Sequence, residues 1–210
     1  MKQGYFVTGT GTGVGKTFVS VALLRLARSL GMRAFGFKPI ETGCVGLGED
    51  QRALVAAAGE WQTGDLAGLL QFELPAAPLV AAAVESRAID LESIRKPFER
   101  GANQADFVLV EGAGGWRVPI TPESDMSTLA AMLKLPVIVA ASATLGTINH
   151  SLLTVEAIER DGQSVAAVIL SQRPDDPTDL IATNVSEIER RWNGRVLVLQ
   201  QDPQVLASLF

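Results

Sequence analysis

Short apolar runs alternate with amphipathic stretches along most of the chain. Strands are predicted at residues 5–7, 33–37, 106–110, 135–141, 165–170 and 195–199, and helices at 17–30, 50–59, 90–100, 148–160 and 180–192. The first helix is predicted from Val21, Leu24, Ala27 and Arg28, which lie at helical spacing, and Gly31 is expected to end it. The alternation predicts an α/β fold with three layers, in which helices flank a mostly parallel central sheet.

Composition and charge restrict the class of protein. A chain of 210 residues, 47% of them hydrophobic and 20% charged, fits a single domain spanning 1–210. The formal net charge is −5 and no Lys/Arg cluster forms a basic face, so we expect no nucleic-acid partner. The single cysteine, Cys44, excludes an intramolecular disulfide. Met1 to Tyr5 form no apolar leader and no apolar run approaches the ~18 residues of a membrane span, so we expect a cytoplasmic protein without membrane contact.

The strongest motif lies between the first strand and the first helix, where four glycines in the segment 9–15 precede Lys16 and Thr17. Such glycines let backbone N–H groups point at phosphate oxygens, and the helix start adds the positive end of its dipole. Lys16 is expected to reach the β- and γ-phosphates and the Thr17 hydroxyl to bind Mg²⁺. The general motif has its first glycine at the position of Thr10, whereas here it is Gly9. The motif predicts a P-loop NTPase-like domain; a glycine-rich turn without a ligand is the alternative.

Two carboxylates and a second lysine are candidates for the same site. Glu111 ends a predicted buried strand, and a P-loop fold holds the carboxylate that serves its metal ion at such a position. The alternative is that Glu111 only caps a turn. Asp50 is a second candidate for Mg²⁺, or else an exposed helix N-cap. Lys38 closes the second strand and is expected to stabilise charge on a transferring phosphoryl group; a structural salt bridge is the alternative. Thr42, in the following loop, is expected to contact substrate.

Four motifs occur in an order and spacing that resembles the dethiobiotin synthetase family. They are the segments 9–17, 38–43, 110–115 and 145–150, which read GTGTGVGKT, KPIETG, VEGAGG and LGTINH. The early glycine of the phosphate loop is this family's own form. The resemblance implies an enzyme that makes dethiobiotin, ADP and phosphate from diaminopelargonic acid, CO₂ and Mg-ATP. An amine captures CO₂ as a carbamate, the carbamate attacks the γ-phosphate, and the second amine displaces phosphate to close a cyclic urea.

The resemblance also implies roles for individual residues. The catalytic residues are Lys16 and Lys38. The nucleotide-binding residues are Gly13, Val14, Gly15, Lys16, Thr17, Phe18, Asp50, Glu111, Gly112, Ala113, Gly114, Ser171 and Gln172. The substrate-binding residues are Thr12, Thr42, Gly146, Thr147 and Asn149, the last three supplied by a partner subunit, so that a homodimer is implied. The Mg²⁺-binding residues are Thr17, Asp50 and Glu111.

Two departures from the family pattern concern the base of the nucleotide. The family commonly has asparagine after the strand near residue 170, where this chain has Ser171 and Gln172, and a base-binding loop is placed only loosely at 200–203. Two other classes share the phosphate loop. Amidotransferase-type synthases of cobyrinate synthesis carry a glutaminase domain, for which this chain has no room. Switch NTPases of the ParA/MinD type place a lysine early in the loop, where residues 9–13 contain none.

Overall fold

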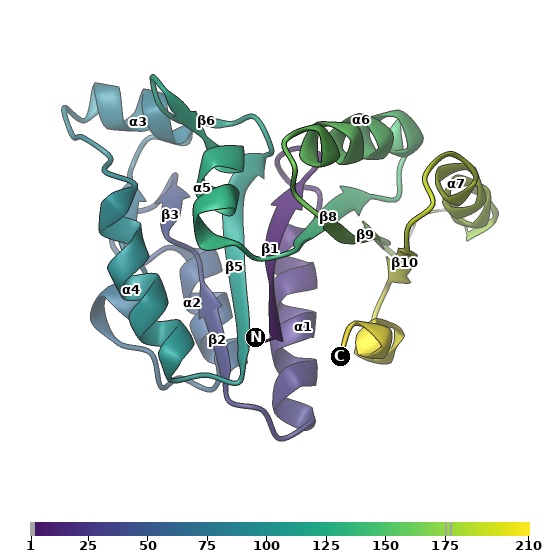
Figure 1. The fold of residues 1–210 in the computed structure, drawn as a ribbon, viewed down its shortest axis with the longest axis horizontal. Coiled ribbons are helices and arrows are strands. Elements are labelled where there is room, and N and C mark those ends of the chain that lie inside the picture. The colour runs from purple at the N-terminus through teal and green to yellow at the C-terminus, as the bar shows by residue number, and fades with distance from the viewer. Residues whose placement is uncertain (1–2, 175, 177) are drawn as a thin grey trace.

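The computed structural model describes residues 3–174, 176 and 178–210, so Met1 and Lys2 of the expected N-terminal segment lie outside the described residues. The central sheet has six parallel strands in the order β10–β9–β8–β1–β5–β2 (Figure 1). Their bounds are β1 (Gln3–Gly9), β2 (Ala34–Phe37), β5 (Phe107–Gly115), β8 (Val137–Ser142), β9 (Val165–Ser171) and β10 (Val196–Leu199). The sheet therefore takes strands from nearly the whole length of the chain.

Helices cover both faces of this sheet, which confirms the predicted three-layer α/β fold (Figure 1). The helices are α1 (Lys16–Ser29), α2 (Glu49–Ala58), α3 (Pro78–Val84), α4 (Glu92–Asn103), α5 (Met126–Leu133), α6 (Thr147–Arg160), α7 (Thr178–Arg191) and the 3₁₀ helices η1 (Gly64–Leu66) and η2 (Pro203–Leu209). One apolar core packs the sheet against α1, α2 and η2. The other packs it against α4, α5, α6 and α7. Continuous apolar strands follow from this double cover, since β8 is buried from residue 137 to residue 141.

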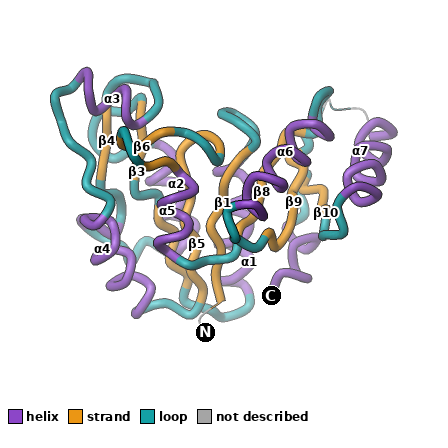
Figure 2. Tube along the Cα trace, turned by 45° about the horizontal axis from the view of Figure 1, so that its top comes forward, coloured by secondary structure: helices purple, strands orange, loops and turns teal. Residues whose placement is uncertain are grey.

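Two pairs of short strands lie outside the central sheet. The parallel pair is β3 (Ile40–Thr42) with β4 (Leu70–Phe72), and the antiparallel pair is β6 (Pro119–Thr121) with β7 (Ser124–Asp125). Helix α3 contacts β3, β4 and β6, and Figure 2 shows this group at one end of the molecule. The group forms a small wall beyond the carboxyl ends of β5 and β2, where ligands of open parallel sheets bind.

The predicted helices and strands are all present, with two corrections. Strand β5 runs to Gly115 instead of ending at residue 110, so Glu111 lies inside the strand and not after it. Of the residues at helical spacing in α1, Leu24 and Ala27 are buried, whereas Val21 is half-buried and Arg28 is exposed. The second correction is that α1 ends at Ser29, one residue before the predicted end at residue 30. Helices α3 and α5 and the short strands were not predicted.

Strand β2 is an edge of the central sheet, and side chains occupy its outer backbone groups. The Gln62 carboxamide accepts a hydrogen bond from Gly36 N–H (3.1 Å) and donates to the Gly36 carbonyl (2.7 Å). The Trp61 indole donates to the Ala34 carbonyl (2.7 Å). These bonds replace the missing neighbouring strand, and an edge satisfied in this way offers no template for another chain.

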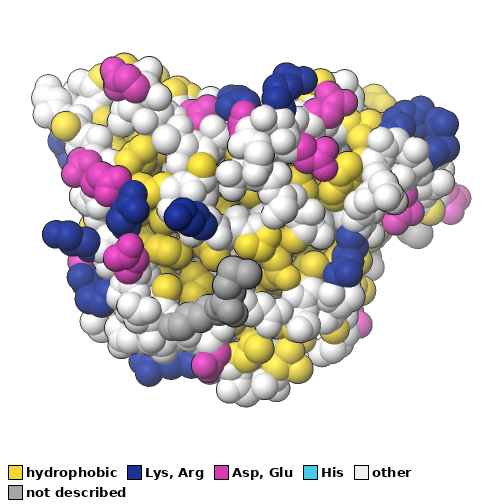
Figure 3. Space-filling model, in the orientation of Figure 1, with side chains coloured by type: hydrophobic (Ala, Val, Ile, Leu, Met, Phe, Trp, Pro, Cys, Tyr) yellow, Lys and Arg dark blue, Asp and Glu magenta, His cyan; other side chains and the backbone are white. Residues whose placement is uncertain are grey.

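The surface carries both signs of charge. On the face seen in Figure 3, Lys and Arg side chains are interspersed with Asp and Glu, and hydrophobic patches lie between them. Two of the large hydrophobic side chains that are exposed, Leu145 and Leu153, belong to α6 and the turn before it. Within the described part of the chain, no helix combines the length and the apolar character that crossing a membrane requires.

Candidate active site

The segment between β1 and α1 forms a curled loop at the carboxyl end of the sheet. The Thr10 N–H donates to the Ala140 carbonyl of β8 (3.0 Å), which fixes where the loop leaves the strand. Gly13 and Gly15 have φ values of 73° and 93°, in the left-handed region that favours glycine. A side chain at Gly15 would also overlap the Ser171 hydroxyl at the end of β9. Position 15 therefore requires glycine both for its backbone and for its contact with β9.

Lys16 begins α1, and its ammonium is turned into this loop. Nζ donates to the Gly11 carbonyl at 3.0 Å, and the side chain is buried. Burial lowers the pKa of the Lys16 ammonium, the Glu111 carboxylate opposes this change, and Lys38 adds to it. The loop thus holds a desolvated cation next to a curl of backbone N–H groups, which is an arrangement that binds phosphate.

Lys38 lies at the centre of a second group of charges. Its ammonium donates to the Asp50 carboxylate and, at 2.8 Å, to Oε1 of Glu111, which also accepts from the Thr17 hydroxyl at 3.0 Å. Lys38 is 5% exposed and Glu111 is 0% exposed. Burial alone would lower the pKa of Lys38, but the two carboxylates outweigh it and raise that pKa. Burial opposes ionisation of Asp50, yet Lys38 holds the pKa of Asp50 below its ordinary value. Lys38 and Asp50 are therefore both charged at neutral pH.

Strand order explains why these residues meet. β5 lies between β1 and β2, and Glu111 of β5 pairs in register with Val7 of β1, just before the phosphate loop. Lys38 directly follows β2, the other neighbour of β5. Asp50 lies in the first turn of α2, where the helix dipole favours an anion. Residues far apart in sequence are thus brought together by the ends of three adjacent strands.

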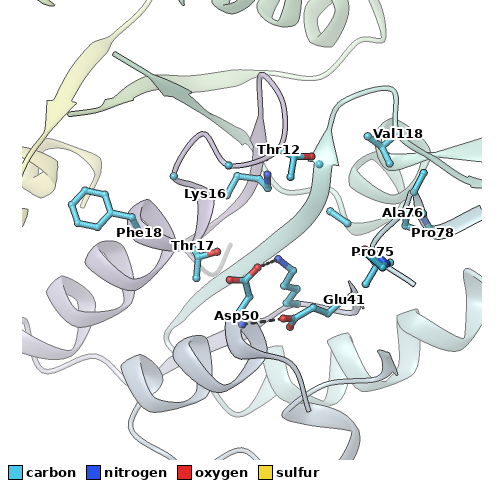
Figure 4. A pocket seen from close by; sticks show the side chains of 17 residues that line it. Thr12, Lys16, Thr17, Phe18, Glu41, Asp50, Pro75, Ala76, Pro78 and Val118 are labelled. Carbon is cyan, nitrogen blue, oxygen red and sulfur yellow. Dashed lines mark hydrogen bonds and ion pairs between the residues drawn. The ribbon is translucent and has the colours of Figure 1, made fainter. Parts of the chain in front are cut away.

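A cavity of about 600 Å³ opens beside this cluster. Many of the predicted residues line it, namely Thr12, Gly13, Gly15, Lys16, Thr17, Phe18, Lys38, Thr42, Asp50, Ala113 and Gly114. Figure 4 shows Thr12, Lys16, Thr17 and Asp50 around it, whereas the Phe18 ring points away from them. The structure therefore places the phosphate loop, the second lysine and one carboxylate around a single space.

Eight predicted residues do not line the cavity. Glu111 and Gly112 lie behind its wall in the buried part of β5. Val14 packs inside the loop, where a Cβ on Gly9 would come within 2.8 Å of its Cγ2. Ser171 touches Gly15, and the Gln172 N–H donates to the Leu199 carbonyl at 2.9 Å. The remaining three are Gly146, Thr147 and Asn149.

Those three residues form the start of α6, and none of them lines the cavity of its own chain. Gly146 is the N-cap, with φ 93° and no side-chain hydrogen bond to the helix N–H groups. Thr147 is buried, with a hydroxyl that has no hydrogen-bond partner among the described residues, and Asn149 is exposed. The preceding Leu145 is 92% exposed. The Thr147 N–H donates to the Thr144 carbonyl (3.2 Å), and this helix start, which has no side-chain cap, lies beside an exposed apolar side chain.

Sequence reasoning missed several residues that line the cavity. Residues 75–78, which read PAAP, form one wall between β4 and α3. Val118 forms another part of the wall, and Glu41 contributes a buried carboxylate. The two prolines were an available signal, since a rigid turn often precedes a helix with proline at its first position. Glu41 and Val118 carried no such signal, because Glu41 lies in a short strand that was not predicted and Val118 lies in the connection between β5 and β6.

Comparison with known proteins identifies the family of this chain. The profile of a family described as an AAA domain matches residues 3–205. The ATP-dependent dethiobiotin synthetase BioD of Anaeromyxobacter sp. (strain K) is 43% identical over 198 residues, which cover 94% of this chain and 89% of that protein. The chain belongs to the dethiobiotin synthetase family. The protein of the same name from Aromatoleum aromaticum is 41% identical over 219 residues, covering 99% of this chain and 96% of that protein.

A solved structure supports the fold assignment alone. A chain of the MinC:MinD cell division protein complex from Aquifex aeolicus matches with a TM-score of 0.58 at 16% identity, covering 99% of this chain and 84% of that one. This likeness places the chain among P-loop NTPase folds, as the phosphate loop predicted. Because one fold hosts many activities, the likeness carries no argument about substrate.

Proposed function

We propose that this chain converts diaminopelargonic acid, CO₂ and Mg-ATP into dethiobiotin, ADP and phosphate. The observation that carries the proposal is the pair of buried ammonium groups, Lys16 and Lys38, at the border of one cavity that also contains the phosphate loop. Such a pair can neutralise a γ-phosphate and a carbamate brought together in line. Membership of the dethiobiotin synthetase family supports the same reaction.

The proposed reaction needs positioning and charge stabilisation more than a protein nucleophile. One amine of the diamine bonds to CO₂ and loses a proton, which gives a carbamate. A carbamate oxygen attacks the γ-phosphorus of ATP and ADP leaves, so that a carbamic–phosphoric anhydride forms. The second amine attacks the carbamoyl carbon, phosphate leaves, and the five-membered urea closes. Lys16 and Lys38 stabilise the negative charge that develops on the transferring phosphoryl group.

The nucleotide is proposed to lie along the phosphate loop. Its phosphates would contact Gly13, Val14, Gly15, Lys16, Thr17 and Phe18, and the β5 segment Gly112, Ala113 and Gly114 would border the γ-phosphate. Support comes from the position of the loop at a helix start and from the lining of the cavity. Ser171 and Gln172 are proposed near the base, because the end of β9 touches the loop at Gly15.

Thr17, Asp50 and Glu111 fit an Mg²⁺ ion that accompanies the nucleotide. Oε2 of Glu111 is buried and has no hydrogen-bond partner among the described residues, so it retains a free acceptor. The described residues contain no group of three His, Cys, Asp or Glu side chains suited to a metal. This agrees with an ion that takes its other ligands from phosphates and water, as Mg²⁺ does. When bound, such an ion draws negative charge from the β- and γ-phosphates.

The diamine is proposed to lie near Thr12 and Thr42, which both line the cavity. Its carboxylate would be held by Gly146, Thr147 and Asn149 of a second subunit in a homodimer. Support comes from the positive end of the helix dipole at this start, which has no side-chain cap and suits an anion, and from its position outside the cavity of its own chain. The exposed Leu145 and Leu153 beside it suit a subunit contact. The proposed location is the cytoplasm.

The direct test measures product. Purified protein with diaminopelargonic acid, bicarbonate, Mg²⁺ and ATP should form dethiobiotin and phosphate in equal amounts, and leaving out the diamine should stop phosphate release. Lys16→Ala provides the control, because this side chain has only one hydrogen bond, to the loop itself. We expect this variant to fold normally and to lose activity at least about a hundredfold. Phosphate release that is independent of the diamine would rule the proposal out.

A further inference from the structure

The first turn of α2 is capped by a side chain that comes from a different strand. Glu41 of β3 has a buried carboxylate that lines the cavity. Its Oε1 accepts from the Asp50 N–H at 3.1 Å (Figure 4), and its Oε2 accepts from the Gln51 N–H at 2.9 Å. Both oxygens are thus committed to helix N–H groups, where the helix dipole favours a negative charge.

The residue at the ordinary capping position makes room for this carboxylate. Gly48 is the N-cap of α2, with φ −70° and ψ 168°, a conformation that any residue adopts. A serine or aspartate there would normally supply the capping oxygen. A Cβ on Gly48 would instead overlap the Glu41 carboxylate, whose three atoms are the nearest to that point. Glycine at 48 therefore follows from the presence of Glu41, not from the backbone.

A second tie joins the same helix turn to Lys38. The fully buried Gln51 donates from Nε2 to the Lys38 carbonyl at 3.0 Å. Its Oε1 accepts from the Gly48 N–H (3.2 Å) and from the Gln71 side chain of β4 (3.0 Å). Glu41 and Gln51 thus fix the backbone on both sides of the ion pair between Lys38 and Asp50.

We propose that Glu41 is a positioning residue whose carboxylate anchors the first turn of α2 to β3, so that the Asp50 carboxylate lies against Lys38 at the cavity. This inference rests on the proposed function, because it concerns the same lysine and the same carboxylate. Glu41 itself touches no reacting atom. It acts through the backbone of Asp50, since a shift of the helix start would move that carboxylate away from both the ammonium and the nucleotide.

Three variants separate this anchoring from simple helix capping. Glu41→Ala removes both acceptors, and Glu41→Gln keeps one. The double variant Glu41→Ala/Gly48→Ser returns a capping oxygen to the helix, at a point where the nearest obstructing atoms belong to Glu41, but leaves the helix unattached to β3. Glu85→Ala is the matched control, because the Glu85 carboxylate also accepts two successive backbone N–H bonds, from Glu73 (2.7 Å) and Leu74 (3.2 Å), without lining the cavity.

In the dethiobiotin assay, Glu41→Ala should lower kcat about 10- to 100-fold, the range typical of residues that orient a ligand-binding carboxylate. The KM for the diamine should change little, and the Mg²⁺ concentration for half-activity should rise. Glu41→Gln should fall between wild type and Glu41→Ala. The double variant should recover Tm but not kcat, and Glu85→Ala should keep wild-type kinetics. Recovery of kcat together with Tm would show that Glu41 is only a cap, and a raised KM at unchanged kcat would show that it binds substrate; either result overturns the proposal.

A measurement that needs no catalytic turnover tests the anchoring role of Glu41 separately from the proposed function. Amide hydrogen exchange measured by NMR should show that the Asp50 and Gln51 amides are protected in wild type and in Glu85→Ala, and exposed in Glu41→Ala. If wild-type protein makes no dethiobiotin, the proposed function fails, but the exchange data still test whether Glu41 anchors the start of α2. Unchanged protection in Glu41→Ala would overturn the anchoring role whatever the enzyme makes.

Discussion

The starts of α1 and α6 have nearly the same backbone but opposite surroundings. Each helix begins after a left-handed glycine with φ 93°, and neither has a side-chain cap. Gly15 is enclosed by β9 and borders the cavity, next to Lys16. Gly146 follows a leucine that is 92% exposed, and no residue of the cavity reaches it.

The comparison shows which helix start obtains its partners within a single chain. Strand order gives the first helix start its partners, since β1, β5 and β2 end together. The second start does not line the cavity, and the Thr147 hydroxyl has no hydrogen-bond partner among the described residues. Under the proposed function this start has a ligand carboxylate as its partner, and the variants below test that proposal.

The largest effect is expected from Lys38→Met, which removes the centre of the enclosed cluster. Glu111 is fully buried and would lose its ion-pair partner, and breaking such a pair costs about 3–5 kcal/mol. Turnover should fall at least about a hundredfold, because a charge-stabilising donor is lost. Chemical denaturation and the dethiobiotin assay measure the two effects.

A neutral replacement of both partners serves as the control. Lys38→Met/Glu111→Gln should regain much of the lost stability, because no unpaired charge remains buried, and should stay inactive. A Lys38→Met protein with near wild-type turnover would place the second lysine outside the chemistry.

An intermediate effect is expected at the exposed helix start. Asn149→Asp adds a negative charge where a substrate carboxylate is proposed, and a charge near a helix end is worth about 1–2 kcal/mol. The KM for the diamine should rise roughly tenfold while Tm stays close to wild type, since Asn149 is exposed. Steady-state kinetics at varied diamine concentration provide the measurement.

Mixing two variants tests whether the second helix start serves a neighbouring subunit. Lys16→Ala and Asn149→Asp carry their defects in different halves of the proposed composite site. After dissociation and reassembly at low diamine, heterodimers would contain one intact site, so activity should rise to about a quarter of wild type. Activity that stays at the mean of the two variants would place both halves in one chain.

The smallest effect is expected at α5, where the side chain of the N-cap residue Asp125 accepts a hydrogen bond from the Thr128 N–H. Burial opposes ionisation of Asp125, but hydrogen bonds from Ser127 and Thr128 and the charge of Arg117 hold the pKa of Asp125 below its ordinary value. Asp125 therefore stabilises the fold above the unfolded pKa of about 4, and this contribution is lost as the pH falls through the folded pKa.

Asp125→Asn keeps a capping oxygen and removes the charge. At pH 7 the variant should be less stable by a few tenths of a kcal/mol, because the site is largely solvated. The difference in unfolding free energy between wild type and variant should shrink toward pH 3. A difference that is constant with pH would show that the charge contributes nothing.

The sequence predicted the part of the site that depends on local motifs. The glycines of the phosphate loop, Lys38 and Glu111 each sit at the end of a periodic element, so the edge of a parallel sheet was enough to bring them together. The alternative that Lys38 forms only a salt bridge also holds in part, since both of its carboxylate partners are present.

The rest depended on tertiary structure that no periodic signal reveals. β3 has three residues in a Gly/Pro-rich stretch, too few for an alternating pattern, so the contact between Glu41 and α2 could not be predicted. The close approach of Gly15 to Ser171 joins the phosphate loop to the end of β9, two segments that are far apart in sequence. The length of β5 was underestimated because its last residues are small and glycine-rich rather than apolar.

The amide of Gln62 has a consequence beyond local bonding. One side chain imitates the adjacent strand that β2 lacks, so the flank of the sheet is already closed in the single chain. Two copies of the protein therefore cannot pair strand to strand at this point of the β2 edge, whereas β10, the opposite edge of the sheet, is not closed by Gln62. A small residue at position 62 would leave the Gly36 N–H and carbonyl unpaired, and such backbone groups are the ones to which an extended peptide adds as a strand.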